Sequence, residues 1–296
     1  MPVLPLIALT PNLSGVSVTA PSGFVETVMW PFTAAVSTVL VLAHDLLATI
    51  GDPSPGAVWT GSIVLLVLVV RAALLPLAVR GVRLAHAQVR AEPEISRIRR
   101  RYAGRTDRES LLRQSRELRA AQAEHGLGAS AMLPAFAQVP VMSALYLVLR
   151  DLAAGTPVGI IGAELAHAAA SSTVAGLQMD DTALHLGQAI LAGTLGSLNG
   201  FAVLAVLAVS IGLLTWLTQR HLVLANASAA SLSGPAGPVM AMMPVLATGG
   251  AVVAAVLMPA GLVLYWLAGA VWTAGQQAVV VRFWPTPTSQ AAARFG

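Results

Sequence analysis

Five runs of about twenty residues that carry almost no charge limit what this chain can fold into. They cover residues 58–80, 130–149, 201–219, 239–258 and 260–281. A helix needs roughly 20 mostly apolar residues to cross a membrane. Only 10% of the 296 residues are charged and 56% are hydrophobic, whereas a soluble domain carries about 25% charged residues. The sequence therefore predicts an all-α integral membrane protein with five transmembrane helices.

A further apolar stretch, residues 24–50, precedes these runs. It carries His44 and Asp45 near its end, and the glycine- and proline-rich residues 51–56 follow it as a strong helix break. We expect an interfacial helix on the outer membrane surface; a sixth span or an uncleaved signal segment is the alternative. The chain then divides into an outer N-terminal segment (1–56), a core (57–282) and a short cytoplasmic tail (283–296), with no large outer domain before the first span.

The uneven distribution of arginine predicts the orientation. Twelve arginines lie between Arg80 and Arg119, against five acidic residues, and no arginine precedes Arg71. Residues 150–200 hold one arginine and four acidic residues. Because basic loops stay in the cytoplasm, we expect residues 81–128 to form a cytoplasmic hairpin and residues 150–200 an outer loop. The N-terminus is then outside and the C-terminus inside.

The cytoplasmic hairpin is expected to consist of two amphipathic helices that meet near Gly104. Pro93 marks a kink in the first helix or its start. Thr106 and Glu109 match a capping box at the start of the second helix, and Gly126 is a plausible end. The apolar positions expected to hold the two helices together are Leu84, Ile95, Ile98, Tyr102, Leu111, Leu112 and Leu118.

The basic residues of this hairpin have two interpretations. They can fix the topology and rest on anionic lipid headgroups, or they can form a docking surface for an acidic or RNA partner, such as a ribosome that carries a nascent chain. The two interpretations are compatible. The residues that would form the surface are Arg97, Arg99, Arg100, Arg101 and Arg105.

Arg71 lies inside the first apolar run, after fourteen residues without a charge. An ionised guanidinium at such depth costs several kcal/mol unless it finds water, a partner or the interface, and arginine cannot lose its proton instead. The alternatives are a water-filled groove and a side chain that snorkels to the headgroups. Neutral polar side chains on other spans could line the groove, or they could form interhelical hydrogen bonds. The candidates are Gln138, Tyr146, Thr215, Trp266 and Gln276.

No catalytic or cofactor motif accompanies these residues. The chain has no cysteine, and its six histidines are scattered, so we expect no metal and no cofactor. The sequence matches none of the common nucleotide-binding or hydrolase motifs. Asp180 and Asp181 are more typical of a solvated turn than of a catalytic pair. The five expected spans contain no carboxylate or histidine, which argues against a proton-driven transporter.

Several ordered motifs resemble the YidC family of membrane protein insertases. Val70 to Leu77 is similar to the first core span of that family, whose arginine is its best-known groove residue, and Glu92 to Tyr102 is similar to the start of its hairpin. Leu133 to Tyr146 resembles the second span, with Arg150 at its end. Pro259 to Trp266, followed by Gln276 and Gln277, resembles the last span and is the most specific motif.

The resemblance implies a bacterial plasma-membrane insertase and chaperone that is not an enzyme. Its spans would surround a hydrophilic groove open to the cytoplasm, where Arg71 attracts acidic residues in the short tails of nascent membrane proteins. The hairpin would receive the substrate and contact the ribosome, the targeting machinery, the Sec translocon or anionic lipids. The chain looks like the compact five-span form, but it lacks the asparagine-proline often found before the second span and the long basic tail of some members.

Two other functions remain open from the sequence. A small-molecule channel or transporter could use the same polar groove, and would need polar residues on several spans through to the outer face. An assembly factor could hold helices for other complexes without any groove transport.

Overall fold

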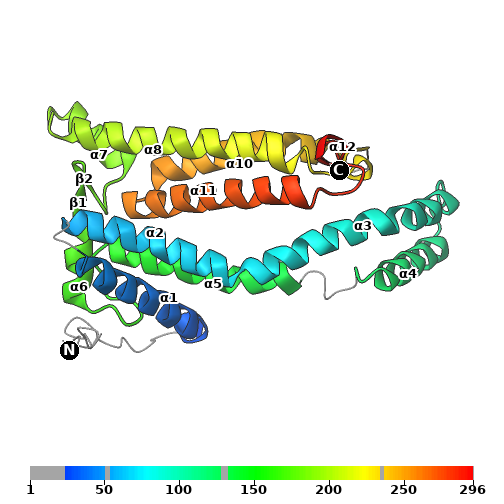
Figure 1. The fold of residues 1–296 in the computed structure, drawn as a ribbon, viewed down its shortest axis with the longest axis horizontal. Coiled ribbons are helices and arrows are strands. Elements are labelled where there is room, and N and C mark those ends of the chain that lie inside the picture. Colours follow the sequence, from blue (N-terminus) through cyan, green and yellow to red (C-terminus); the bar gives the residue numbers. More distant parts are fainter. Residues whose placement is uncertain (1–23, 51–53, 128–132, 234–236, 296) are drawn as a thin grey trace, which may run out of the picture. The chain divides into compact units, whose positions relative to one another are not determined.

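The computed structural model describes residues 24–50, 54–127, 133–233 and 237–295, and its regular structure is almost entirely helical (Figure 1). The chain forms two compact units. The first unit takes in residues 1–69, 140–207 and 255–266, and the second takes in residues 70–139, 208–254 and 267–296. Each unit thus gathers segments that lie far apart in the sequence. The helices that contribute to both units are α2 (Pro55–Ala73), α5 (Leu133–Ala153), α8 (Ser197–Leu217), α10 (Gly237–Leu257) and α11 (Ala260–Phe283).

The first unit contains the whole segment that was expected as an outer loop. Its helices and strands, some of which continue into the second unit, are α1 (Phe24–Ala48), α2 (Pro55–Ala73), α5 (Leu133–Ala153), α6 (Ala163–Ala170), β1 (Thr173–Val174), β2 (Leu177–Gln178), α7 (Ala183–Leu191) and α8 (Ser197–Leu217).

Tight packing is concentrated in the first unit. Among the described residues, the twelve largest side chains that are fully buried all belong to it. They come from α1, α2, α5, α8, α11 and the segment before α6. These side chains are Ser37, Leu40, Trp59, Ile63, Leu66, Val67, Leu145, Val148, Leu149, Ile161, Leu204 and Val263.

Helix α1 contributes to this tight packing. The Ser37 hydroxyl accepts a hydrogen bond from the Ile160 backbone N–H at 3.1 Å, and Gly159, which has a φ of +60°, leaves no room for a Cβ beside that hydroxyl. Two helical turns further along, α1 meets α2, where the rings of His44 and Trp59 lie 4.4 Å apart between centroids. The helix expected over residues 24–50 therefore exists and is packed against its neighbours.

Four helical segments of the described residues are long and apolar enough to cross a membrane. They are Thr27–Ala48, Pro55–Ala73, Ser197–Val223 and Gly237–Leu257. Three of them correspond to expected spans, and α1 meets the same criterion, so the interfacial placement of residues 24–50 stays a prediction. The remaining expected spans form α5 and α11 (Ala260–Phe283). Both helices carry glutamines, and neither is among the four segments that meet the criterion. The count of five spans also stays a prediction.

The expected outer loop has its own structure. Ala175 and Gly176, both with positive φ, form a two-residue turn that pairs Thr173 with Gln178, as in a tight β-hairpin. Asp181 is buried rather than solvated. Its carboxylate accepts a hydrogen bond from the Gln178 N–H at 2.8 Å. The expectation of a solvated turn is therefore wrong for Asp181, while Asp180 is exposed.

The segment that was expected as an outer loop also holds the start of α11. Only two residues separate helix α10 (Gly237–Leu257) from α11, so the turn between these two helices is tight. The carbonyl of Asp181 accepts a hydrogen bond from the Ala260 N–H at 2.8 Å, and that of Met179 accepts one from the Gly261 N–H at 3.0 Å. These bonds satisfy donors that a helix leaves open at its N-terminus.

In the second unit, the helix expected over residues 58–80 is interrupted. Helix α2 ends at Ala73, and α3 (Leu75–Arg101) begins after Leu74. Pro76 occupies the first turn of α3, and because it has no N–H it cannot donate the hydrogen bond that would continue the helix. Leu74 itself keeps right-handed helical backbone angles. Helix α3 then continues past residue 81 without a break and contains Pro93.

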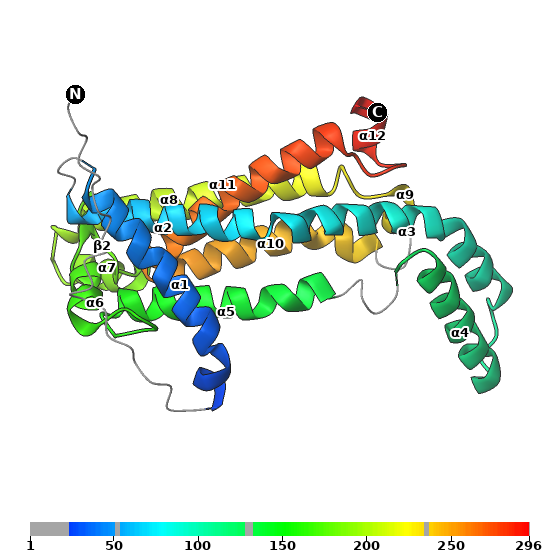
Figure 2. The ribbon, with the colours of Figure 1, turned by 60° about the horizontal axis from the view of Figure 1, so that its bottom comes forward.

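The expected hairpin is formed by α3 and α4 (Arg108–Glu124), which lie side by side in Figures 1 and 2. Ile98, Tyr102 and Ala121 are buried between them, with Leu118 packed alongside. Gly104 and Gly126 both have positive φ beyond the helix ends, as expected. Leu111 and Leu112 are about half exposed, at 50% and 48%, so their assignment to the apolar stripe is wrong.

The start of α4 also differs from the prediction. Asp107, not Thr106, caps the helix, and its carboxylate accepts a hydrogen bond from the Ser110 N–H at 2.8 Å. Asp107 occupies the extended conformation typical of a cap. Both residues are good caps, so the sequence pattern alone could not separate the two registers.

Candidate functional site

Arg71 lies in the last turn of α2, directly before the interruption at Leu74. The residue is half-buried, and among the described residues no carboxylate forms an ion pair with it. Its guanidinium keeps five donors in a planar fork, which suits a carboxylate approached with two parallel hydrogen bonds. The positive charge of Arg71, which the sequence predicted to need water or a counter-charge, is therefore available to a ligand.

A cavity of about 460 Å³ lies beside Arg71, within the second unit. We call it the polar cavity. Its polar lining comes from α2, α5, α11 and the segments that follow α8 and α11, and its apolar lining comes mostly from α3. The lining residues are Arg71, Leu74, Leu77, Ala78, Gly81, Val82, Ala85, Gln138, Asn226, Gln276, Gln277, Val280 and Thr286.

Three of the residues predicted for the groove thus lie together, namely Arg71, Gln138 and Gln276. Thr215 lies on α8 in the same unit and is not among the lining residues. Tyr146 and Trp266 belong to the first unit. There, the Arg150 guanidinium lies over the Tyr146 ring, 5.9 Å from its centroid, and Trp266 is half-buried.

Gly269 on α11 makes room for the Arg71 side chain. A Cβ built at Gly269 would lie 3.4 Å from Arg71 Nη2, so the guanidinium rests against the bare backbone of α11. The sequence analysis missed this residue. The available signal was a glycine inside an apolar helix, which lowers helix stability unless close packing requires it.

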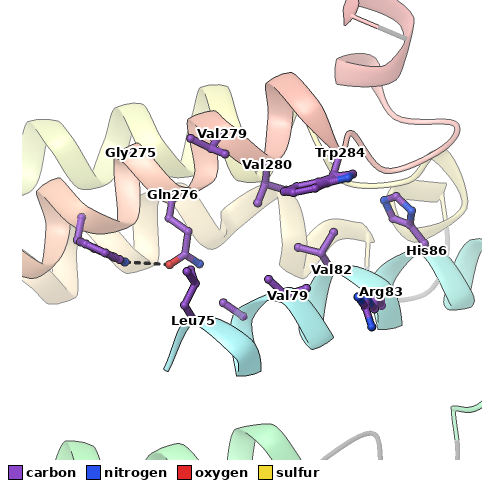
Figure 3. Close-up of a pocket in the computed structure, with 12 residues that line it drawn as sticks. Leu75, Val79, Val82, Arg83, His86, Gly275, Gln276, Val279, Val280 and Trp284 are labelled. Atoms are coloured by element: carbon purple, nitrogen blue, oxygen red, sulfur yellow. Dashed lines mark hydrogen bonds between the residues drawn. The ribbon is translucent and has the colours of Figure 1, made fainter. Parts of the chain in front are cut away.

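Gln276 is held in place by its own helix. The Trp272 indole N–H donates to Gln276 Oε1 at 3.0 Å, shown as the dashed line in Figure 3. The amide oxygen is therefore occupied, and the amide NH₂ remains for the cavity. Gln277, the next residue, also lines the polar cavity and was noted only as part of the last-span motif.

The chain after α11 closes one side of the polar cavity. The Thr286 backbone N–H donates to Asn226 Oδ1 at 2.7 Å, and both residues line the cavity. The Ala291 N–H donates to the Ala225 carbonyl at 3.0 Å, at the start of α12 (Gln290–Phe295). The expected short tail is thus fastened to the segment between the π-helical turn η3 (Thr218–Val223) and α9 (Ala229–Ser233), which no sequence pattern indicated.

The predicted hairpin arginines form an exposed basic surface on α3 and the turn after it. Arg101 donates to Glu117 at 3.1 Å, and the Arg105 guanidinium lies over the Tyr102 ring, 5.6 Å from its centroid. Among the described residues, Arg97, Arg99 and Arg100 have no carboxylate partner. They are therefore the members of the set whose charge is most available to a partner.

Two pKa values report how the hairpin is held. The Tyr102 hydroxyl donates to Glu117 at 2.7 Å, and this hydrogen bond to a carboxylate raises the pKa of Tyr102 above its usual value of 10.0. The hydrogen bonds from Ser110 lower the pKa of the Asp107 carboxyl below its usual 3.8. In both residues the hydrogen bond stabilises the protonation state that exists at neutral pH.

The chemistry of the polar cavity is that of binding. Its walls offer a guanidinium, amide groups and a backbone rich in small residues, but no nucleophile paired with a base. Within the described residues, no three histidine, aspartate or glutamate side chains gather in a way that could hold a metal ion. The arrangement is suited to receive a polar or anionic segment of another molecule.

Comparison with known proteins assigns the family. Residues 53–287 match the model of the family described as 60Kd inner membrane protein. The membrane protein insertase YidC of Streptomyces avermitilis is 32% identical over 271 residues, covering 89% of this chain and 60% of that protein. The chain therefore spans less than two thirds of the length of that relative.

Two further relatives carry the same name. The membrane protein insertase YidC of Tropheryma whipplei strain Twist is 29% identical over 278 residues, which cover 90% of this chain and 88% of that protein. That of Mycobacterium tuberculosis strain CDC 1551 is 30% identical over 264 residues, which cover 82% and 69% respectively. The family match, the similar proteins and the apolar helices together show that this chain is a multi-pass bacterial membrane protein. It belongs to the 60Kd inner membrane protein family, that of the YidC insertases, which are not enzymes.

Proposed function

We propose that this protein inserts nascent membrane proteins into the bilayer through the polar cavity. The observation that carries the proposal is the half-buried Arg71, which has no ion-pair partner in the described part of the chain and stands beside a cavity with amide side chains in its lining. A permanent cation in an apolar helix is stable only with water or a counter-charge, and an incoming carboxylate supplies that counter-charge.

The mechanism follows from this placement. A short acidic tail enters from the cytoplasm, and its carboxylate meets the Arg71 guanidinium. At about 4 Å and an effective dielectric constant of roughly 20, such a pair is worth about 4 kcal/mol, which offsets part of the cost of removing the tail from water. Gln138, Gln276 and Gln277 offer hydrogen bonds to its backbone. The following apolar helix of the substrate moves into lipid, and its burial drives the reaction without a nucleotide.

The remaining predicted residues and the orientation belong to the same proposal. Tyr146, Thr215 and Trp266 would contact the substrate during its passage, with the N-terminus of the insertase outside and its C-terminus in the cytoplasm. The exposed hairpin arginines would meet the nascent chain first. Their charge suits anionic lipids, the ribosome and the targeting machinery, and the Sec translocon is a further possible partner.

Substitution of Arg71 tests the proposal. Purified variants are reconstituted into vesicles, and insertion of a single-span substrate with two acidic residues in its outer tail is measured by protease protection. We expect Arg71→Ala to slow insertion roughly tenfold or more, because an ion pair of a few kcal/mol is lost, and Arg71→Lys to restore most of it.

Two controls separate the proposal from its rivals. The same substrate with a neutral tail should respond much less to Arg71→Ala, and Arg80→Ala, which removes an exposed arginine outside the polar cavity, should leave insertion unchanged. Equal insertion by the wild type and Arg71→Ala would refute groove transport and leave a chaperone that only holds helices. A small-molecule flux through the wild-type protein that Arg71→Ala abolishes would favour the channel.

A further inference from the structure

A second cavity, of about 580 Å³, lies between α3 and α11 in the second unit. We call it the apolar cavity. It shares Ala78, Val82, Gln276 and Val280 with the polar cavity, so the two cavities adjoin. Its walls are almost entirely hydrocarbon. The lining residues are Leu75, Ala78, Val79, Val82, Arg83, His86, Trp272, Gly275, Gln276, Val279, Val280 and Trp284.

The polar groups of the apolar cavity are unevenly placed. Figure 3 shows Arg83, His86 and Trp284 gathered toward one end, while Leu75 and Gln276 lie toward the other. Arg83 is exposed and has no carboxylate partner among the described residues. His86 Nε2 is buried, and within the described part of the chain no hydrogen-bond partner reaches it. The cavity therefore joins a long apolar wall to a basic end.

We propose that the apolar cavity binds an anionic phospholipid, with one acyl chain along α3 and α11 and the phosphate at Arg83 and His86. The guanidinium and the imidazole N–H are donors that a phosphate accepts. The Trp284 indole at the same end is amphipathic, as is typical of side chains at headgroup level. A volume of about 580 Å³ falls within the range of pockets for small molecules, roughly 300–1,000 Å³.

The charge at one end of the cavity favours a phospholipid over a peptide helix. An apolar helix of a translocating substrate presents no anion to Arg83 and His86. A phospholipid joins a hydrocarbon chain and a phosphate in one molecule, so it matches both the apolar wall and the basic end.

Native mass spectrometry of the purified protein tests the proposal. The protein is released from micelles that contain equal amounts of phosphatidylglycerol and phosphatidylcholine with identical acyl chains. We expect one tightly held phosphatidylglycerol. Arg83→Ala should weaken its binding roughly five- to tenfold, because a charge-assisted hydrogen bond to the phosphate is lost, and His86→Ala should weaken it less.

Matched variants distinguish the site from general surface charge. Arg80→Ala removes an exposed arginine three residues away that does not line the apolar cavity, and should leave the bound lipid in place. Gly275→Leu places a side chain in the cavity, where a Cβ at Gly275 meets nothing within 4 Å, and should remove the bound phosphatidylglycerol. Gly250→Leu has equal room outside the cavity and should have no effect.

The opposite results would overturn the proposal. Equal retention of the two lipids would refute selectivity for an anionic headgroup, and a lipid adduct that survives Gly275→Leu would place the acyl chain elsewhere. A photoreactive residue at Val279, activated in intact bacterial membranes, adds a check on the occupant. A lipid mass on the peptide supports the assignment, whereas cross-links to polypeptide alone would assign the cavity to a substrate helix instead.

Discussion

At the scale of single residues, the sequence predicts where the Arg71 charge lies in the chain but not which residues surround its guanidinium. Arg71 stands out in any reading of the chain because nothing near it in sequence compensates a guanidinium. Gly269 lies almost two hundred residues away, and only the fold brings its backbone against Arg71 Nη2. Asn226 and Thr286 were missed for the same reason, since a backbone-to-amide hydrogen bond between distant segments leaves no periodic pattern.

The close approach at Gly269 predicts that a larger side chain there displaces the guanidinium. We expect Gly269→Leu to reduce insertion of the acidic-tail substrate toward the level of Arg71→Ala, because a Cβ already lies 3.4 Å from Arg71 Nη2. Gly249→Leu, where a Cβ has open space, is the control for a leucine in an apolar helix. Normal insertion by Gly269→Leu would mean that the guanidinium position is unimportant.

At the scale of elements, existence and type were predictable, while ends and registers were less so. Apolar length alone indicated the long helices, and Gly104 correctly marked the turn of the hairpin. Neighbouring good caps at Thr106 and Asp107 made the start of α4 ambiguous by one residue. The interruption at Leu74 follows from Pro76, but a proline in an apolar run can also be accommodated without a break.

The Asp107 cap predicts an acid-sensitive start of α4. Since the folded pKa of Asp107 is lowered, its contribution is fully present above the ordinary pKa of 3.8 and is lost as the pH falls through the folded value. The protection factor of the Ser110 amide, which compares its exchange rate with that of an unfolded chain at the same pH, should fall over this range. Asp107→Asn, an equally good but neutral cap, should abolish the pH dependence; if the dependence persisted, another group would be responsible.

The crossing of α8 and α10 predicts a packing-sensitive position. A Cβ at Gly212 would lie 2.8 Å from Val252 Cγ2, so a side chain forces the two helices apart. We expect Gly212→Leu to destabilise the fold by about 1–3 kcal/mol, the usual cost of overpacking, as measured by thermal unfolding in detergent. Gly249→Leu on α10 has open space and should cost little. An equal loss of stability in Gly212→Leu and Gly249→Leu would indicate a general effect of leucine in an apolar helix.

At the scale of the whole molecule, charge bias predicts which segments face each side of the membrane. The chain has no cysteine, so single cysteines can be introduced at the exposed Ala103 and Thr194. With a membrane-impermeant maleimide on intact cells, we expect labelling at position 194 and protection at position 103 until the cells are opened. The reverse pattern would invert the proposed orientation and place the hairpin outside.

The uneven burial described for the two units has a mechanical consequence. Interior atoms packed as densely as a crystal resist deformation, and the largest such side chains all belong to the unit without Arg71. The second unit, which would accommodate unrelated polypeptides, therefore contributes less to holding the fold together. Random substitutions should be tolerated more often in the second unit than in the first. Variants with an altered substrate preference should therefore be sought there first.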